Sequence, residues 1–388
     1  MRRLARVEPF LASSSSQVMG YCRLKGYKVP KHRKTKQDTV NEEALREIIR
    51  HHPEDEVLDS VLEYRAIQKA KGYLADTYMG KDYRYHPIFT FHPNSGRLAA
   101  KSPNTMNQPK GRSDYKAKLA EAVRSTIVAP PGWLLLEPDW KAIEALLVGY
   151  FAEDPAYMRA ARLGVHGILA SHILGEPISL ALPDADILRR VNALKRAHPH
   201  VYSEAKVAIH ASNYLEGIFN MARDLRCEVS LAKKYRAIYY KMAPLVQKWQ
   251  DSICKRAHKD HFLMNPFGYV SPYYFAVWAK NKYTGEWEPG KQASEVASFL
   301  PQSTAAAMLR ETLLSLSEVE EEEKWYLLTP VHDSLLVCTR KEELAETATI
   351  LKGLMTKEWK ELGGLSVEVE MKVGESWNER EMSSYATR

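Results

Sequence analysis

The stretch LEPDWKAIEALLVGYFAED, residues 136–154, changes its pattern at an aspartate. The apolar run GWLLL leads into it after a proline and predicts a buried strand that ends near Asp139. From Ala142 the apolar residues recur three and four positions apart, as they do on one face of a helix. Because an aspartate at such a junction is usually a helix N-cap, the junction alone assigns no chemistry.

A second aspartate stands at a comparable position far along the chain. In TPVHDSLLV, residues 329–337, a polar triplet interrupts two β-like runs and predicts a hairpin with Asp333 at its bend. If the strands are neighbours, Asp139 and Asp333 converge at one end of one sheet. Carboxylates so placed suit Mg²⁺, and two such ions can promote an in-line phosphoryl displacement. A turn-forming aspartate is the simpler alternative for Asp333.

The remaining sequence predicts helices and strands in separate blocks. Short β-like runs broken by Pro, Asn and Gly follow His86, a hairpin is expected over residues 265–278, and a last strand over 365–373. Helical patterns cover residues 42–76, 142–259, 292–316 and 341–360. We therefore expect an α+β chain in which two distant pieces of sequence form one sheet and a helical block is inserted between them.

Composition narrows the classes of function. The 388 residues are 45% hydrophobic, with a formal net charge of +7 and a pI near 8.9, which favours a polyanionic partner. The four cysteines are far apart, which argues against a zinc site or a disulfide framework. No apolar stretch reaches the roughly 20 residues of a membrane helix, and residues 1–17 lack the apolar centre of a secretory signal. We expect no membrane partner.

Several segments together resemble family-A, DNA polymerase I-like DNA polymerases. PDWKAIEALLVGYFAED and PVHDSLLV resemble the palm motifs A and C of that family. In the same order, SGRLAAKSPNTMNQP is similar to its Thr-Gly-Arg-Leu-Ser-Ser stretch, PQSTAAAM to its Gln-Gly-Thr-Ala-Ala-Asp segment, and VGESWNE to its Gly-Glu-x-Trp ending. VLEYRAIQKAKGYLAD looks like its thumb-to-palm helix, so the resemblance covers nearly the whole chain. Collinear motifs are far more specific together than singly.

The resemblance implies a right-hand polymerase with an antiparallel-sheet palm, a helical fingers insertion and a partial helical thumb. The implied boundaries are 1–84 for the partial thumb with the thumb-palm helix, 85–160 for the first part of the palm, 161–290 for the fingers and 291–388 for the second part of the palm. The chain would then begin partway through the thumb, so we expect no proofreading exonuclease in it. The expected compartment is the cytoplasm of a bacterial or phage-infected cell, with an organelle as the alternative.

The implied activity is template-directed DNA synthesis, an enzyme activity in which dNTPs are added to a primer 3′-hydroxyl. Asp139 and Asp333 would be catalytic and, with the backbone carbonyl of Trp140, would bind two Mg²⁺ ions, for which Mn²⁺ is a substitute. The implied partners are primer-template DNA, dNTPs and a separate exonuclease or replication protein. The implied contacts with the primer-template are Arg97, Asn104, Asn107, Gln302 and His332.

The fingers segment YSEAKVAIHASNYLEG supplies the implied nucleotide contacts. Lys206 offers a point charge to the triphosphate, and Tyr214, eight residues and about two turns later, stacks near the new base pair. Glu144 would close the sugar pocket against Tyr214 and so reject a 2′-hydroxyl. His210 stands at the family's Phe/Tyr position. His166, in a segment similar to the family's Val-His-Thr, would restore part of the positive charge that Tyr202 removes, with Arg196 and His198 as the alternatives.

Departures from the family pattern keep two alternatives open. Tyr202 stands where the family has arginine, Ala211 and Leu215 stand at its two glycine positions, and Ser334 replaces the usual glutamate of motif C. One alternative is therefore a catalytically silent or partner-dependent DNA-binding subunit. The other is a polymerase with altered sugar or template choice, against which Glu144 argues.

Overall fold

The computed structural model describes residues 10–32, 35–73, 79–91, 94–107, 115–280, 287–378 and 380–386. The chain divides into two compact units. The first comprises Met1–Ile88, Lys101–Val128 and Ser376–Glu381, and the second comprises Phe89–Ala100, Ala129–Glu375 and Met382–Arg388. Both catalytic candidates, Asp139 and Asp333, belong to the second unit.

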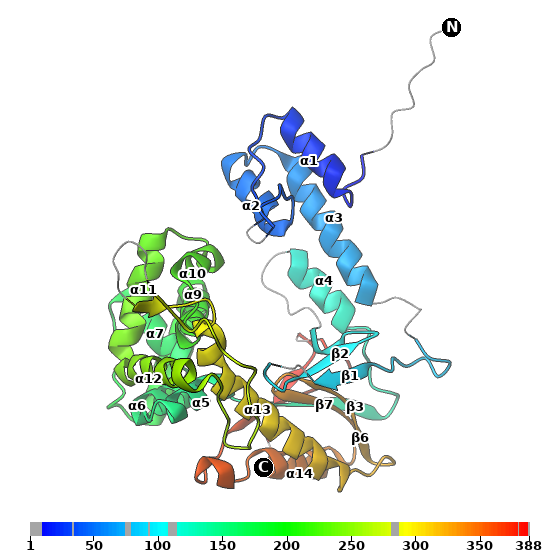
Figure 1. Cartoon of the computed structure of the whole chain (residues 1–388). Coiled ribbons are helices and arrows are strands. Elements are labelled where there is room, and N and C mark those ends of the chain that lie inside the picture. Colours follow the sequence, from blue (N-terminus) through cyan, green and yellow to red (C-terminus); the bar gives the residue numbers. More distant parts are fainter. Residues whose placement is uncertain are drawn as a thin grey trace. The chain divides into compact units, whose positions relative to one another are not determined.

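The first unit is helical in its described part. Its helices are α1 (Ser15–Leu24), α2 (Glu42–His51), α3 (Glu56–Tyr73) and α4 (Tyr115–Arg124), with a short 3₁₀ turn, η2 (Thr105–Asn107) (Figure 1). The first two helices begin at side-chain caps, because Ser14 and Asn41 accept backbone N–H bonds from Gln17 and Ala44. The sequence pattern predicted two helices over 42–76, and α2 and α3 confirm them within the described residues.

The second unit is built on a five-stranded antiparallel sheet with the strand order β6-β7-β3-β8-β9. Strand β3 (Trp133–Trp140) comes from the first part of the sequence. Strands β6 (Trp325–Val331), β7 (Ser334–Arg340), β8 (Val369–Gly374) and β9 (Ser383–Tyr385) come from its end. The prediction of one sheet from two distant pieces is confirmed, and β3 lies directly beside the predicted hairpin.

Helices cover the sheet and fill the insertion between its two halves. Helix α13 (Ala293–Ser317) packs on α14 (Leu344–Met355), which lies against β3 and β7 (Figure 1). The inserted helices are α5 (Ile143–Phe151), α6 (Pro155–Leu163), α7 (Val165–Leu174), α8 (Asp184–Ala197), α9 (Pro199–Asn213), α10 (Ile218–Leu225), α11 (Val229–Met242) and α12 (Pro244–Asp260). Helix α9 contacts α7, α8, α10 and α11, and its Ala205, Ala208 and Ala211 are fully buried. These small side chains let its neighbours approach closely.

The hairpin expected over residues 265–278 is wrong in its placement. Only one isolated bridge, Met264 to Val270, forms there, whereas the hairpin lies in β4 (Trp278–Lys280) and β5 (Trp287–Pro289). Asn265 explains the difference because its side-chain oxygen accepts the backbone N–H groups of Phe267 and Tyr269 at 3.0 and 2.9 Å. A side chain thus takes the place of a strand partner.

Two short features complete the description of the fold. Strands β1 (Ile88–Phe91) and β2 (Leu98–Lys101) form a second two-stranded sheet, and η3 (Lys360–Leu362) follows α14. None of the helices in the described ranges is both long and apolar enough to cross a membrane.

Candidate active site

Sheet register brings Asp139 and Asp333 to the same end of the sheet. Asp139 lies opposite Ser334 on β7, and His332 and Asp333 form the turn between β6 and β7. The backbone N–H of Trp140 donates to the Asp333 carbonyl at 3.4 Å, which closes the two strands beside the turn. Both aspartates are half-buried, and the Oδ1 atom of Asp139 is itself buried.

The side chain of Trp140 packs on the face of the sheet opposite to Asp139 and fixes the end of β3. Its side chain is 2% exposed, its Nε1 donates to the Met355 carbonyl at 2.8 Å, and its ring packs edge-on against Trp359. Consecutive side chains of a strand point to opposite faces, so burial of Trp140 under the helical layer turns Asp139 to the other face. Ser334 and Glu370 share that face with Asp139, because both lie directly opposite it in register.

The donor set at this end of the sheet fits Mg²⁺. Within the described ranges no three His, Cys, Asp or Glu side chains gather closely enough to hold a metal ion by themselves. Mg²⁺ is commonly bound by one or two carboxylates that leave its remaining positions to water and substrate phosphates. Asp139, Asp333 and the carbonyl of Trp140 therefore form a chemically suitable set of oxygen donors, with substrate supplying the rest.

Glu144 is the centre of a polar cluster that joins several of the predicted contacts. It lies in the first turn of α5, two residues after the N-cap Ala142, whose φ of +50° is in the left-handed region. Arg97 forms an ion pair with its Oε1, and the Tyr214 hydroxyl donates to its Oε2 at 2.6 Å. Gln302 of α13 approaches the same hydroxyl. Glu144 is thus held on both oxygens by residues from two other segments, and Gln302 adds a third segment through Tyr214.

The electrostatics of this cluster favour a charged Glu144 beside a neutral Tyr214. Burial favours the protonated acid, but the Arg97 charge and the hydrogen bond from Tyr214 lower the pKa of Glu144 below its ordinary value. Burial and the Glu144 charge raise the pKa of the Tyr214 hydroxyl well above its ordinary value. The tyrosine therefore remains a hydrogen-bond donor and the glutamate remains an acceptor across the neutral range.

A glycine and an arginine hold Arg97 in position. Gly96 has a φ of +65°, and a side chain there would come within 2.9 Å of Arg310 and 3.1 Å of the Tyr269 ring. Arg310, on α13, donates to the Gly96 carbonyl at 3.0 Å and stacks over the rings of Tyr269 and Phe91. The backbone next to Arg97 is thereby fixed to the long helix that also carries Gln302.

A buried network that sequence reasoning missed fixes the end of α9, where Tyr214 is the C-cap. Gln250 of α12 donates to the carbonyls of Ser212 and Asn213 at 2.8 and 2.9 Å, and Tyr240 donates to Gln250. The Asn213 side chain accepts from the hydroxyls of Tyr157 and Tyr239. One signal was available in the sequence, because Gln250 falls on the same helical stripe as Val246, Ile253 and Ala257.

The other nucleotide candidates lie on or beside α9. Lys206 and His210 are exposed, and the His210 ring packs edge-on against Tyr214 with 5.0 Å between centroids. His166, on α7, packs edge-on against Tyr202 with 6.0 Å between centroids. Burial and the charges of Lys206 and Lys195 lower the pKa of His166 to about 4, so its imidazole is neutral at pH 7.

The remaining candidates are distributed between the two units. His332 is exposed in the β6–β7 turn, with a φ of +60°. Asn104 and the backbone of Asn107 belong to the first unit, and the Asn107 side chain lies outside the described residues. The structure thus brings together Arg97, Glu144, Tyr214, His210 and Gln302, and leaves the roles of Asn104, Asn107 and His332 as predictions.

This chain is similar in sequence to a known protein family and to several known proteins. The model of DNA polymerase family A matches residues 1–379. The thermostable DNA polymerase I of Thermus aquaticus is 24% identical over 348 residues, covering 86% of this chain and 37% of the relative. DNA polymerase I of Chloroflexus aurantiacus is 22% identical over 88% of this chain and 34% of its own length. This chain therefore spans little more than a third of these relatives.

An organellar relative and a solved structure extend the comparison. The chloroplastic and mitochondrial DNA polymerase I A of Arabidopsis thaliana is 22% identical over 77% of this chain and 29% of its own length. The polymerase domain of M. smegmatis Pol1, solved with a DNA primer-template and a dNTP, has a TM-score of 0.73 and 20% identity. It matches 96% of this chain and 62% of that one. This likeness identifies the fold as that of a polymerase domain.

Proposed function

This chain belongs to DNA polymerase family A, and on that basis we propose that it extends a primer 3′-end with deoxynucleotides chosen by a template. The observation that carries the proposal is the register that sets Asp139 beside the β6–β7 turn containing Asp333. In the proposed reaction the primer 3′-oxygen bonds to the α-phosphorus, the 3′-hydroxyl proton is lost and pyrophosphate leaves. We further propose that these residues carry polymerisation and no proofreading exonuclease.

In the proposed site, Asp139, Asp333 and the Trp140 carbonyl hold two Mg²⁺ ions, with Mn²⁺ as a substitute. When bound, the ions would lower the charge on the phosphates and favour an ionised 3′-oxygen. The chain contributes orientation, because two adjacent strands and the buried Trp140 set the directions of the two carboxylates. Lys206 contributes a charge-assisted contact to the triphosphate, and His166 contributes a neutral imidazole.

Sugar selection is proposed for Glu144 and Tyr214. The 2.6 Å hydrogen bond between Tyr214 and Glu144 places the aromatic ring and the carboxylate side by side in one surface. The ion pair with Arg97 holds the carboxylate in that position. A 2′-hydroxyl against such a surface would clash and would lose its water without a free partner. His210 packs on the Tyr214 ring and would complete the nucleotide side of this surface.

The proposed partners are primer-template DNA and dNTPs, with a separate exonuclease or replication protein as a further partner. Arg97, Gln302, Asn104, Asn107 and His332 are proposed to contact the primer-template. The subdomain boundaries 1–84, 85–160, 161–290 and 291–388 remain our proposal for thumb, palm, fingers and palm. The bacterial relatives support a bacterial or phage-infected cell as the proposed compartment, and the organellar relative supports the alternative.

Primer extension tests the proposal against the silent-subunit alternative. A labelled primer-template is incubated with the purified chain, Mg²⁺ and either dNTPs or rNTPs, with metal-free reactions as controls. Templated extension that needs dNTPs and the metal supports the proposed function. Tight primer-template binding without extension contradicts it and favours a silent or partner-dependent subunit, as the departures at Tyr202, Ala211 and Ser334 would allow.

A further inference from the structure

Two lysines from different helices converge on the ring of Tyr202. Lys195 is near the end of α8, and its Nζ atom lies 5.6 Å from the ring centroid. Lys206 follows Tyr202 by one turn of α9, and its Nζ atom lies 5.5 Å from the same centroid. Ammonium groups at such distances are attracted to the face of an aromatic ring. One side chain therefore gathers two positive charges at a single place on the fingers helices.

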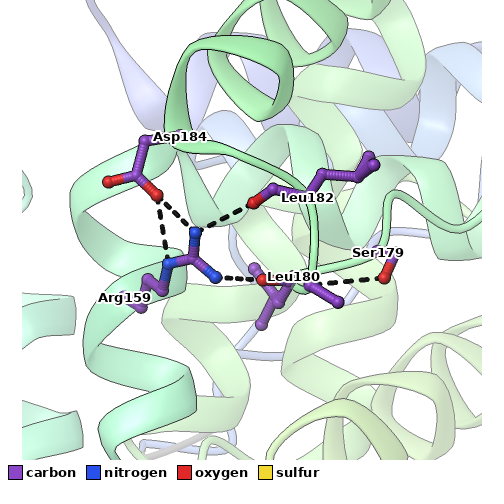
Figure 2. Close-up of polar contacts among 6 residues, drawn as sticks. Arg159, Ser179, Leu180, Leu182 and Asp184 are labelled. Carbon is purple, nitrogen blue, oxygen red and sulfur yellow. Dashed lines mark hydrogen bonds and ion pairs between the residues drawn. The ribbon is translucent and has the colours of Figure 1, made fainter.

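Helix α8, which carries Lys195, is held at its start by Arg159. Arg159 of α6 donates to the carbonyls of Leu180 and Leu182 and forms an ion pair with Asp184, the first residue of α8 (Figure 2). Further along, Ile187 and Val191 bury α8 against its neighbours. The start and the middle of α8 are thus fixed, and Lys195 follows one turn after the buried Val191.

His166, on α7, also packs against the ring of Tyr202. Its ring lies 6.0 Å from that of Tyr202, and Lys206 and Lys195 both lower its pKa, which burial already lowers, to about 4. The histidine therefore offers a neutral N–H donor at pH 7 while the lysines carry the charge.

The surrounding charges leave Lys195 available to a ligand. Lys195 is exposed, and no carboxylate of the described residues forms an ion pair with it. Burial raises the pKa of the Tyr202 hydroxyl, and so does the negative charge of Glu370, which is the acidic group that reaches this ring. The exposed ammonium group of Lys195 thus lies beside a neutral imidazole donor, a combination suited to a polyphosphate.

We propose that Lys195 is a triphosphate-binding residue, which supplies from α8 the cation that Tyr202 removes from α9. Because both Lys195 and Lys206 lie against the Tyr202 ring, one polyphosphate would contact both ammonium groups. The inference rests on the proposed function for the identity of the nucleotide, and it concerns the binding of its polyphosphate group.

Equilibrium binding of inorganic tripolyphosphate tests the proposal apart from catalysis. Tripolyphosphate with Mg²⁺ is titrated against fluorescently labelled dATP bound to the whole chain. Lys195→Ala should weaken tripolyphosphate binding about tenfold, the loss expected for one charge-assisted contact. Lys195→Arg should bind like wild type. Arg190→Ala removes an equal charge from another exposed position of α8 and serves as the matched control, with near-wild-type affinity.

A compensating variant makes the test specific. Adding Tyr202→Arg to Lys195→Ala should restore most of the lost affinity, because a cation is returned to the same seat. Equal effects of Lys195→Ala and Arg190→Ala, or no effect of either, would overturn the inference. Templated extension by wild type with unchanged tripolyphosphate affinity in Lys195→Ala defeats this inference alone. A Lys195-dependent affinity without extension supports the inference and defeats only the proposed function.

Discussion

Glu144 shows how one charged side chain can be held in a partly buried position. Arg97 neutralises it on one oxygen and Tyr214 donates to the other, so its side chain remains only 29% exposed without an uncompensated charge. A helix-surface glutamate would need neither partner. The arrangement costs desolvation of two ions, which suggests that the position of the carboxylate matters more than its contribution to stability.

Removing that carboxylate should relax sugar selection. We expect Glu144→Ala to raise the ratio of rNTP to dNTP incorporation by about tenfold or more, since space and a free acceptor site open beside the 2′-position. The ratio of kcat/KM values for the two nucleotides measures this. Tyr214→Phe, which keeps the ring and loses the hydroxyl, is the matched control and should change the ratio less. An unaltered ratio in Glu144→Ala would mean that another residue excludes ribonucleotides.

The lowered pKa of Glu144 also predicts how stability depends on pH. A carboxyl group whose folded pKa lies below its unfolded value stabilises the fold above the unfolded value, about 4.3, and loses that contribution as the pH falls through the folded value. The difference in unfolding free energy between wild type and Glu144→Gln should therefore be constant from pH 6 to 8. It should shrink below about pH 4 in denaturant titrations. A difference that grows on acidification contradicts the assigned direction.

Helix α9 illustrates how a functional element depends on its neighbours. Its last carbonyls, on Ser212 and Asn213, lie at a buried helix end, and Gln250 of α12 donates to both of them. Leu215, just beyond, has a φ of +49°, so the chain keeps a left-handed conformation where the family pattern has glycine. The orientation of Tyr214 thus follows from contacts that the α9 sequence does not contain.

Replacing Gln250 should destabilise the fold through α9. Gln250→Leu keeps the size and removes both side-chain donors. The Asn213 carbonyl then loses its partner, whereas the Ser212 carbonyl keeps the backbone N–H of Leu215 at 3.4 Å, so we expect a cost of about 1–3 kcal/mol. Urea unfolding measures the loss, and the KM for dNTP should rise because Tyr214 is less firmly held. Gln247→Leu, at an exposed position of the same helix, is the control. Equal stability of the two variants would show that the network does not support α9.

Sequence patterns predicted the elements where one periodicity dominates. The apolar run before Asp139, the polar turn at Asp333 and the apolar spacing of α13 each predicted an element that the structure contains. The misplaced hairpin and the pair of lysines on Tyr202 could not be found in this way, because Asn265 acts through side-chain hydrogen bonds and Lys195 acts across two helices. Contacts between separate elements leave no periodic signal in the sequence.

Considered as a whole, the chain combines a familiar fold with altered charges. Residues 1–379 match family A, yet Tyr202 and Ser334 stand where the resemblance in the sequence implies an arginine and a glutamate. The structure puts Lys195 close to the first position, and sheet register puts Glu370 on the other side of Asp139 from Ser334. Neither Lys195 nor Glu370 could be predicted from the motifs, because Lys195 lies on α8 and Glu370 on β8, outside the motifs that contain Tyr202 and Ser334.

The most direct test of the central claim is primer extension by single aspartate variants. Asp139→Asn and Asp333→Asn should each lower templated dNTP incorporation by about a hundredfold or more while primer-template affinity and unfolding free energy change little. Asp251→Asn, on the exposed face of α12, should extend primers like wild type. Extension at the wild-type rate by either Asp139→Asn or Asp333→Asn would contradict the assignment of these two carboxylates as the catalytic pair.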